Sequence, residues 1–442
     1  MISSATHGFS SATLALCSAV GLMAVLAAAC GGGDDEAAIP GLTERPRSSA
    51  AEPIVVAAGA PVVIGVSVPL TGPDADGGQE DRDAVLTAVE RWKIAHGGLL
   101  QGHKIAVRVE DDGCTEEDIT VQAAERLLRQ PGLAGVLGPD CSAGAAAAIP
   151  VYARGGIVSI SGSVTRTDLT EKQPEAGFFF RTAYRNDLEG LLIALATTEV
   201  FNNILLVDDG ESYGQDLAET AIRLMAANGI SVARETIQRG AVDYTELAAK
   251  VAKANPQVVG FAGFNPEAAL FYKQLRDAGY KGVFGASDAA ASVPNFVQAV
   301  GADKAEGVVF VGCALTLPED FRAELTKLHG AEPGASSFVA HYADAATALL
   351  DALAKTAKAQ PDGSLSLDSG QIRDTVAATE LRNGISGSVA FDNHGDRVPS
   401  PGDELETVVK EAIAAKRARV FLELGLVPCT VTGGRLVNAV IS

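Results

Sequence analysis

Short apolar runs alternate along the chain with longer segments in which apolar residues recur every three or four positions. The first runs are VVIGVSV at 62–68, IAVRVE at 105–110, AGVLG at 134–138 and GIVSIS at 156–161. Helical spacing follows at about 79–96, at 115–129 and from Ser142 onward. Apolar runs of this length predict buried strands, and their alternation with helices is typical of βαβ units. The pattern therefore predicts a parallel sheet covered by helices on both faces.

The same pattern restarts in the middle of the chain. Further strands are predicted at 204–208, 230–237, 258–263, 282–287 and 307–312, with helices at 213–228, 244–254 and 266–278. Later helices are predicted at 319–329, 336–358 and 369–379, before a β-rich end containing SVAFD, VFLEL and CTVTGGRLV. Two α/β lobes in simple succession would leave these late helices unaccounted for. We therefore expect the chain to cross back, so that a distant segment completes each lobe and the carboxyl ends of two sheets face a cleft.

The N-terminal segment has the pattern of a secretory signal. The first 29 residues contain no Lys, Arg, Asp or Glu, and 13–29 is almost wholly apolar. This run is shorter than the roughly 20 residues that a membrane-spanning helix needs. Its end, LAAAC, resembles the lipobox of bacterial lipoproteins, which implies that Cys30 becomes the first mature residue and carries acyl chains. An ordinary signal peptide cleaved near Ala29 is the alternative.

The next segment is predicted to be a flexible tether over 30–60, because Gly, Ala, Pro, Ser and acidic residues without periodicity cannot bury enough apolar surface to fold. We thus expect a signal peptide at 1–29 and a folded body from 61, exported and held at a membrane only by its lipid. The chain has 35 Lys and Arg against 55 Asp and Glu, a net charge of −20. Such acidity repels nucleic-acid phosphates, so no nucleic-acid partner is expected.

The cysteines outside the signal and the lipid site are even in number, as expected of disulfides in an exported chain. They are Cys114, Cys141, Cys313 and Cys429. Three connectivities are possible; we favour Cys114–Cys141, because both cysteines follow predicted strands at the start of a helix, which leaves Cys313–Cys429. The six histidines are scattered and no Cys-x-x-Cys occurs, so we expect no metal.

Several sequence motifs follow one another along the predicted folded body. They are VSVPLTGP (66–73), VEDDGCTEEDITVQAAERLL (109–128), VLGPDCSAG (136–144), SISGSVTRTDLT (159–170), FRTAYRND (180–187), ESYGQDLAE (211–219), FNPEAALFYKQLRDAGY (264–280) and FDNHGDR (391–397). From about Val62 to its end, the chain resembles the leucine/isoleucine/valine-binding family of type I periplasmic binding proteins, the solute receptors of ABC importers. The resemblance implies two Rossmann-like lobes joined by a multi-strand hinge, with the ligand in the interlobe cleft. The predicted N-lobe is 61–183 and 314–385, and the predicted C-lobe is 184–313 and 386–442.

Candidate ligand-binding residues lie at the expected carboxyl ends of the strands. Ser142 begins the helix-forming run SAGAAAA, where its hydroxyl and the free N–H groups of a helix start suit a carboxylate. The resemblance implies that Ser142 binds the ligand carboxylate and that Ser163, Val164 and Thr165 hold the amino-acid head. The alternatives are a plain helix cap and an ordinary Ser/Thr turn.

The second lobe supplies the opposite charge. The resemblance places Asp288 where relatives carry an acid that pairs with the ligand ammonium, an interaction that gains strength in a poorly hydrated cleft. Tyr213 and Phe264 match aromatic positions that line the cleft. For Asp288 the alternative is a loop acid, and for the aromatic residues it is a place in the core. Gly77 departs from the leucine-binding pattern, which has an aromatic residue nearby, and this leaves the ligand open.

Together these features predict a receptor that closes by hinge motion on a small amino-acid-like ligand, a branched-chain or related amino acid, and delivers it to an ABC permease. No cofactor is implied. An enzyme is not expected, since the sequence contains no GxSxG elbow, no GxxxxGK[ST] loop and no GxGxxG after a strand. The alternative is the same fold used as a sensor or an envelope protein.

Overall fold

The computed structural model describes residues 53–171, 177–198, 201–227, 229–311, 317–398, 429–432 and 435–437. The chain divides into two compact units, Met1–Glu44 and Arg45–Ser442, and every described residue belongs to the second. Within the described ranges, no helix has the length and apolar character needed to cross a bilayer.

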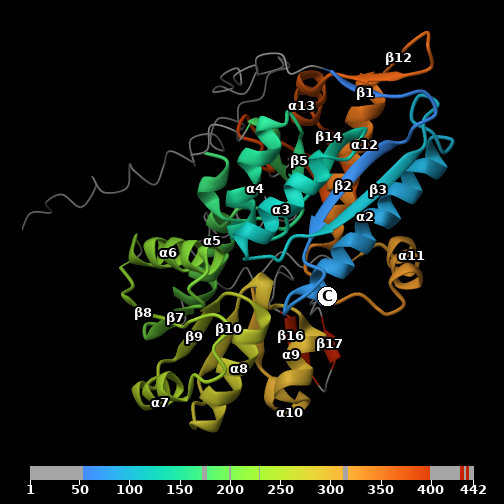
Figure 1. Ribbon diagram of the computed structural model, residues 1–442. Coiled ribbons are helices and arrows are strands. Elements are labelled where there is room, and N and C mark those ends of the chain that lie inside the picture. The colour runs from blue at the N-terminus through green and yellow to red at the C-terminus, as the bar shows by residue number, and fades with distance from the viewer. Residues whose placement is uncertain are drawn as a thin grey trace, which may run out of the picture. The chain divides into compact units, whose positions relative to one another are not determined.

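The first sheet has five parallel strands in the order β3-β2-β4-β5-β6. Its strands are β2 (Val62–Val68), β3 (Ile105–Asp111), β4 (Leu133–Leu137), β5 (Ser159–Ser161) and β6 (Phe179–Arg181). Its helices are α2 (Ala75–Ala95), α3 (Glu117–Leu128), α4 (Ser142–Arg154), α11 (Glu319–His329), α12 (Val339–Thr356) and α13 (Ser369–Ala377). Figure 1 shows α12, from late in the chain, lying beside α2.

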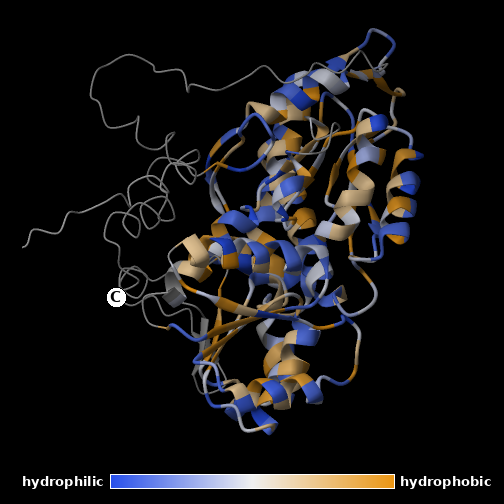
Figure 2. Cartoon of the chain, turned by 90° about the vertical axis from the view of Figure 1, so that its left-hand side faces the viewer, coloured by the Kyte–Doolittle hydropathy of each residue, from blue (hydrophilic) through white to orange (hydrophobic). Residues whose placement is uncertain are grey.

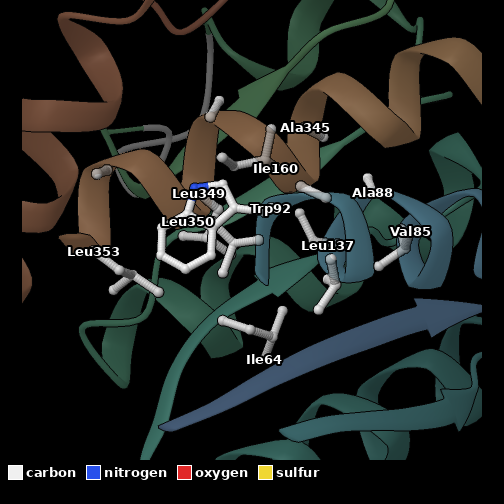
Figure 3. Packing of buried hydrophobic residues seen from close by; sticks show 14 of the residues in the cluster. Ile64, Val85, Ala88, Trp92, Leu137, Ile160, Ala345, Leu349, Leu350 and Leu353 are labelled. Carbon is white, nitrogen blue, oxygen red and sulfur yellow. The ribbon is translucent and has the colours of Figure 1, made fainter. Parts of the chain in front are cut away.

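Alternate residues of the central strand β2 bury opposite faces of this sheet. Ile64 packs in the cluster formed with α2 and α12, whereas its neighbour Val63 packs in the cluster formed with α3 and α4. In the first cluster, the Trp92 ring lies among leucines of α12 (Figure 3), and its indole N–H donates to Asp351 Oδ1 at 2.8 Å. All seven residues of β2 are buried, as expected for a parallel strand covered on both faces.

The second sheet has seven strands in the order β17-β16-β11-β10-β9-β7-β8. The strands are β7 (Ile204–Asp208), β8 (Val232–Thr236), β9 (Val258–Ala262), β10 (Val283–Ala286), β11 (Val308–Phe310), β16 (Cys429–Thr432) and β17 (Arg435–Val437). The first five are parallel, and the last two join the edge antiparallel. The helices of this lobe are α5 (Asn186–Thr198), α6 (Ser212–Ala227), α7 (Thr245–Ala254), α8 (Asn265–Asp277), α9 (Val293–Val300) and α10 (Ala302–Ala305). Figure 2 shows hydrophobic residues along these strands and hydrophilic ones on the outer faces of the helices.

Minor elements complete the described chain. They are a sheet of β1 (Ile54–Val56), β13 (Leu365–Leu367) and β12 (Lys358–Ala359), a hairpin of β14 (Glu380–Gly384) and β15 (Gly387–Ala390), and the 3₁₀ turns η1 (Thr167–Leu169) and η3 (Asp288–Ala290). No helix is predicted from the sequence at 186–198, where α5 forms. VFLEL, which is predicted to be a strand, lies outside the described residues.

The segment 386–398 differs from its predicted placement in the C-lobe. Phe391 packs in the first lobe's core, and Arg397 donates to the carbonyl oxygens of Thr182 and Ser386 at 3.0 and 2.9 Å. The segment after the hairpin therefore belongs with the first sheet, because its buried partners lie there. The other predicted lobe boundaries stay predictions.

A buried ion pair fixes this return of the chain. Asp396 accepts from Arg181 Nε at 2.6 Å and from Arg185 at 3.0 Å, and the Arg181 and Asp396 side chains are 0% and 3% exposed. Burial opposes ionisation of Asp396, but the two guanidinium charges outweigh it and lower the pKa of this carboxyl. Removal of one partner would leave an uncompensated buried charge.

We predict that Asp396→Asn lowers the free energy of unfolding by about 3–5 kcal/mol at pH 7, measured by urea denaturation. The loss should shrink as the pH falls below about 4, because a carboxylate with a lowered folded-state pKa stabilises only while it is ionised. The control Asp320→Asn removes an exposed partner of Arg91 and should change nothing measurable. Equal effects of the two substitutions would contradict the role of the buried pair.

Candidate ligand-binding cleft

One cavity of about 290 Å³ is lined by residues of both lobes. The first lobe contributes Pro73, Asp74, Asp76, Gly77, Asp81, Asp140, Cys141, Ser142, Ser163, Ala335, Ser336, Ser337 and Phe338. The second contributes Tyr213, Phe264, Asn265, Pro266, Asp288, Ala289, Ser292, Asn295 and Ala299. Most of these residues follow the carboxyl ends of strands, where open α/β sheets bind ligands.

Ser142 is the first residue of α4, as the sequence predicts, and only 3% of it is exposed. Its Oγ accepts the backbone N–H of Arg166 at 3.3 Å. The first N–H groups of a helix have no partner within it and carry a partial positive charge. This end of α4 can therefore receive an anion at the cavity wall.

The predicted Cys114–Cys141 disulfide is confirmed, with an S–S distance of 2.01 Å. It ties the start of α4 to the segment that follows β3. Its two cysteines share a buried cluster with Tyr213 and Phe264. The disulfide thus packs against the aromatic residues of the other lobe beside the wall that carries Ser142. The Cys313–Cys429 pairing stays a prediction, because Cys313 lies outside the described residues.

The predicted loop Ser163, Val164 and Thr165 is only partly at the cavity. Ser163 lines it, and its Oγ lies 2.6 Å from the Asp140 carbonyl oxygen and 2.7 Å from Asp140 Oδ1. Val164 is fully buried in an apolar cluster, and Thr165 is 3% exposed; neither belongs to the lining. Ligand contacts of Val164 and Thr165 therefore stay a prediction.

Asp288 and Tyr213 form one polar group in the second lobe's wall. The Tyr213 hydroxyl donates to Asp288 Oδ1 at 2.5 Å, and the backbone N–H of Asp288 donates to Glu189 Oε1 at 3.0 Å. Burial raises the pKa of Asp288 to about 6. Burial and the Asp288 charge raise the pKa of Glu189 well above its usual value. The two adjacent buried carboxyls therefore hold a proton more readily than exposed carboxyls do.

Phe264 packs edge-on against Tyr213, with ring centroids 5.6 Å apart. The guanidinium of Arg239 lies 4.0 Å from the Phe264 centroid and is also ion-paired with Asp74 of the other lobe. This stack holds the ring at the cavity wall. The ion pair with Asp74 gives the Arg239 cation a carboxylate partner.

The lobes are linked by further contacts around the cavity. Ser337 Oγ donates to the Asp288 carbonyl oxygen at 3.2 Å, and Asn295 Nδ2 donates to Asp76 Oδ2 at 3.0 Å. Each of these two hydrogen bonds joins a residue of one lobe to a residue of the other, and all four residues line the cavity. They make the two walls a single site.

Two acids of the first lobe, the buried Asp81 and the half-buried Asp140, line the cavity without having been predicted there. Asp140 could have been found from its position directly after β4, inside VLGPDCSAG. Asp81 lies on α2, where nothing in the local sequence separates it from its acidic neighbours. Gly162 enables the Tyr342 ring to approach Asp140, because an added Cβ there would lie 2.5 Å from Tyr342 Cδ2.

Gly77, the noted departure from the leucine-binding pattern, also lines the cavity. A Cβ added there would meet its nearest neighbour, the Ala335 carbonyl oxygen, at 3.6 Å. That distance is an ordinary contact. The backbone therefore does not require glycine here, and its presence leaves space in the cavity.

A family model described as periplasmic binding protein matches residues 61–401. The chain belongs to the periplasmic binding protein family. An amino acid binding protein of Pseudomonas aeruginosa is 30% identical over 280 residues, covering 62% of this chain and 74% of that protein. Leu/Ile/Val-binding protein homolog 1 of Brucella abortus is 28% identical over 345 residues, covering 76% of this chain and 88% of that protein.

A solved structure agrees with the fold of this periplasmic binding protein. It is the branched-chain amino acid transporter substrate binding protein LivJ from Streptococcus pneumoniae, in complex with isoleucine. The TM-score is 0.66 at 24% identity, covering 76% of this chain and 94% of that chain. This match confirms the predicted two-lobed α/β fold. In the described ranges, no group of three or more His, Cys, Asp or Glu side chains is placed to hold a metal ion.

The Glu189–Asp288 pair predicts a pH-dependent stability. Carboxyls whose pKa is raised in the folded state bind protons there that the unfolded chain has lost, so stability falls as the pH rises from about 4 through the folded-state values. Glu189→Gln removes one of the two buried carboxyls and can donate an amide N–H to Asp288. We expect it to raise the free energy of unfolding at pH 8 by up to about 3 kcal/mol, since Asp288 alone is shifted by about two pKa units.

The gain should be smaller at pH 5 than at pH 8, measured by urea denaturation at both values. Glu246→Gln, an exposed change on α7, is the control and should show no such trend. A Glu189→Gln effect that is equal at both pH values would contradict the raised pKa of the pair.

Proposed function

We propose that the protein is the extracytoplasmic receptor of an ABC importer and binds a small amino-acid-like ligand in the cavity between its lobes. The observation that carries this proposal is the opposite polarity of the two walls. Ser142 and the N-terminus of α4 form an anion-binding end, and the buried carboxylate of Asp288 lines the other wall. A zwitterion with a carboxylate and an ammonium group complements both.

The relatives support the class of ligand. The Pseudomonas aeruginosa relative is named an amino acid binding protein and the Brucella abortus relative a Leu/Ile/Val-binding protein homolog. We therefore assign an amino acid, branched-chain or related, as the ligand class. The cavity of about 290 Å³ is near the lower end of ligand pockets, which suits a molecule of that size.

Binding is expected to operate by closure of the two lobes. Contacts such as Asn295 to Asp76 and Arg239 to Asp74 join the lobes at the cavity rim. A ligand that touches both walls would favour the arrangement in which these contacts form. That arrangement presents a defined surface to a membrane permease.

We further propose that the receptor is exported and remains at the membrane through a lipid on Cys30. The lipobox-like LAAAC and the polar segment that follows it support this anchor. A lipid with a tether keeps the binding body near the permease without a membrane-spanning helix. Export would place the protein in an oxidising compartment, and we propose that Cys313 and Cys429 form a disulfide there.

Calorimetry of the refolded protein against the proteinogenic amino acids tests the ligand class. Any amino acid that binds should bind at least about 100-fold more tightly than its 2-hydroxy acid, which lacks the ammonium group. Asp288→Asn should reduce that preference by about 10-fold or more, since a buried charged hydrogen bond is lost, whereas the exposed change Asp303→Asn should not. No binding to any amino acid, or equal binding of the hydroxy acid, would refute the proposal.

Cys30→Ala tests the anchor. In a bacterial host that processes lipoproteins, the wild-type protein should fractionate with membranes and gain mass from acyl chains, measured by intact-mass spectrometry. The variant should lose both properties. Cys17→Ala, within the proposed signal, is the matched control. Membrane retention of Cys30→Ala equal to that of the wild type would contradict lipidation at this residue.

A further inference from the structure

We infer that the ligand carries a second cationic group, in its side chain, which binds between Asp81 and Asp140. This inference rests on the proposed function and narrows it to cationic amino acids of the lysine and arginine type. It goes beyond the pairing of Asp288 with the α-ammonium, because Asp81 and Asp140 belong to the other lobe.

Asp140 is held in a fixed orientation at the cavity wall. Its Oδ1 accepts from the Tyr342 hydroxyl at 2.7 Å and lies 2.7 Å from Ser163 Oγ, and its backbone N–H donates to Asp112 at 3.2 Å. The two hydroxyl groups both contact Oδ1. No described residue donates to Oδ2 within hydrogen-bond distance, so this oxygen is available to a ligand.

Asp81, on α2, is also held by a hydroxyl group that contacts one of its carboxylate oxygens. Its Oδ1 accepts from Ser336 Oγ at 2.7 Å, and the residue is 2% exposed. Its neighbour Glu80 is stabilised by hydrogen bonds, since it accepts the backbone N–H groups of Gly334, Ala335 and Ser336. Asp81 has no such set of donors.

The cavity provides no cation for this pair. None of the described residues that line it is Lys, Arg or His. Arg239, the cation nearest to Phe264 in the other wall, is ion-paired with Asp74. A buried carboxylate at Asp81 beside a half-buried one at Asp140, without a positive partner, is energetically costly. A ligand cation would remove that cost, whereas an apolar side chain would not.

The opposite wall adds an independent observation. Ser292 lines the same cavity and is 7% exposed, and its hydroxyl has no hydrogen-bond partner in the described part of the chain. A buried hydroxyl without a partner is unfavourable. A polar ligand group in the cavity would supply the missing partner, which a branched-chain side chain does not.

The protonation of the pair agrees with this assignment. Burial raises the pKa of both acids, and their mutual repulsion adds to the rise for Asp81. Asp74, Glu80, Asp112 and Tyr342 surround the pair with acidic groups. Burial and repulsion therefore favour proton binding by the pair, and a cation that enters should oppose it.

Matched ligands test the inference on the full-length protein, refolded to remove any retained ligand. Calorimetry compares L-lysine with L-norleucine and L-arginine with L-citrulline, since each pair differs chiefly in the side-chain cation. We expect at least one cationic member to bind 10-fold or more tightly than its neutral partner. In buffers of different ionisation enthalpy at pH 7, that cationic member should release more protons than its neutral partner.

Asp81→Asn and Asp140→Asn should each reduce the preference for the cationic member 10-fold or more and reduce the extra proton release. Asp303→Asn, an exposed change on α10, should alter neither. Equal or tighter binding of the neutral partners by the wild-type protein would overturn the inference while leaving the proposed function intact. Failure of every amino acid to bind would overturn both. The wild-type comparison holds even if a variant does not fold.

Discussion

The carboxyl ends of parallel strands all reach the same edge of a sheet, and in this protein two such edges border one cavity. That constraint places Asp140 and Ser142 after β4 and Ser163 after β5 in one wall, with Asp288 after β10 in the other. The return of the chain through α12 and the Arg181–Asp396 pair completes the first lobe. The positions of most polar groups at the cavity follow from this arrangement.

Charge then determines what the cavity can hold. The start of α4 favours an anion, whereas the opposite wall contains the buried carboxyl of Asp288 beside that of Glu189. Asp81 and Asp140 add two further acids to the cavity lining, and no described lining residue is a Lys, Arg or His. The cavity therefore favours a ligand with one negative end and an excess of positive charge. The overall net charge of −20 says less about the ligand, because it is summed over the whole chain.

Much of the fold could be predicted from the sequence, because the spacing of apolar residues reflects which positions are buried. The strands at 62–68 and 204–208 and the helix at 319–329 form as predicted, since each has a one-sided or fully buried apolar pattern. The helix α5 was missed in a segment whose run of Leu, Ile and Ala has little periodicity. The placement of 386–398 was wrong because its partners Arg181 and Thr182 are distant in sequence. Asp81 was missed for the same reason: its role depends on Asp140, which only the fold brings close.

The central claim is that the charges of the two walls select an amine-bearing zwitterion. Its most direct test is mass spectrometry of the small molecule released from the natively purified protein, without a refolding step. We predict a molecule with a carboxylate and at least one amine, and a second basic group in its side chain. A retained molecule without an amine, such as a sugar or a dicarboxylate, would contradict the account.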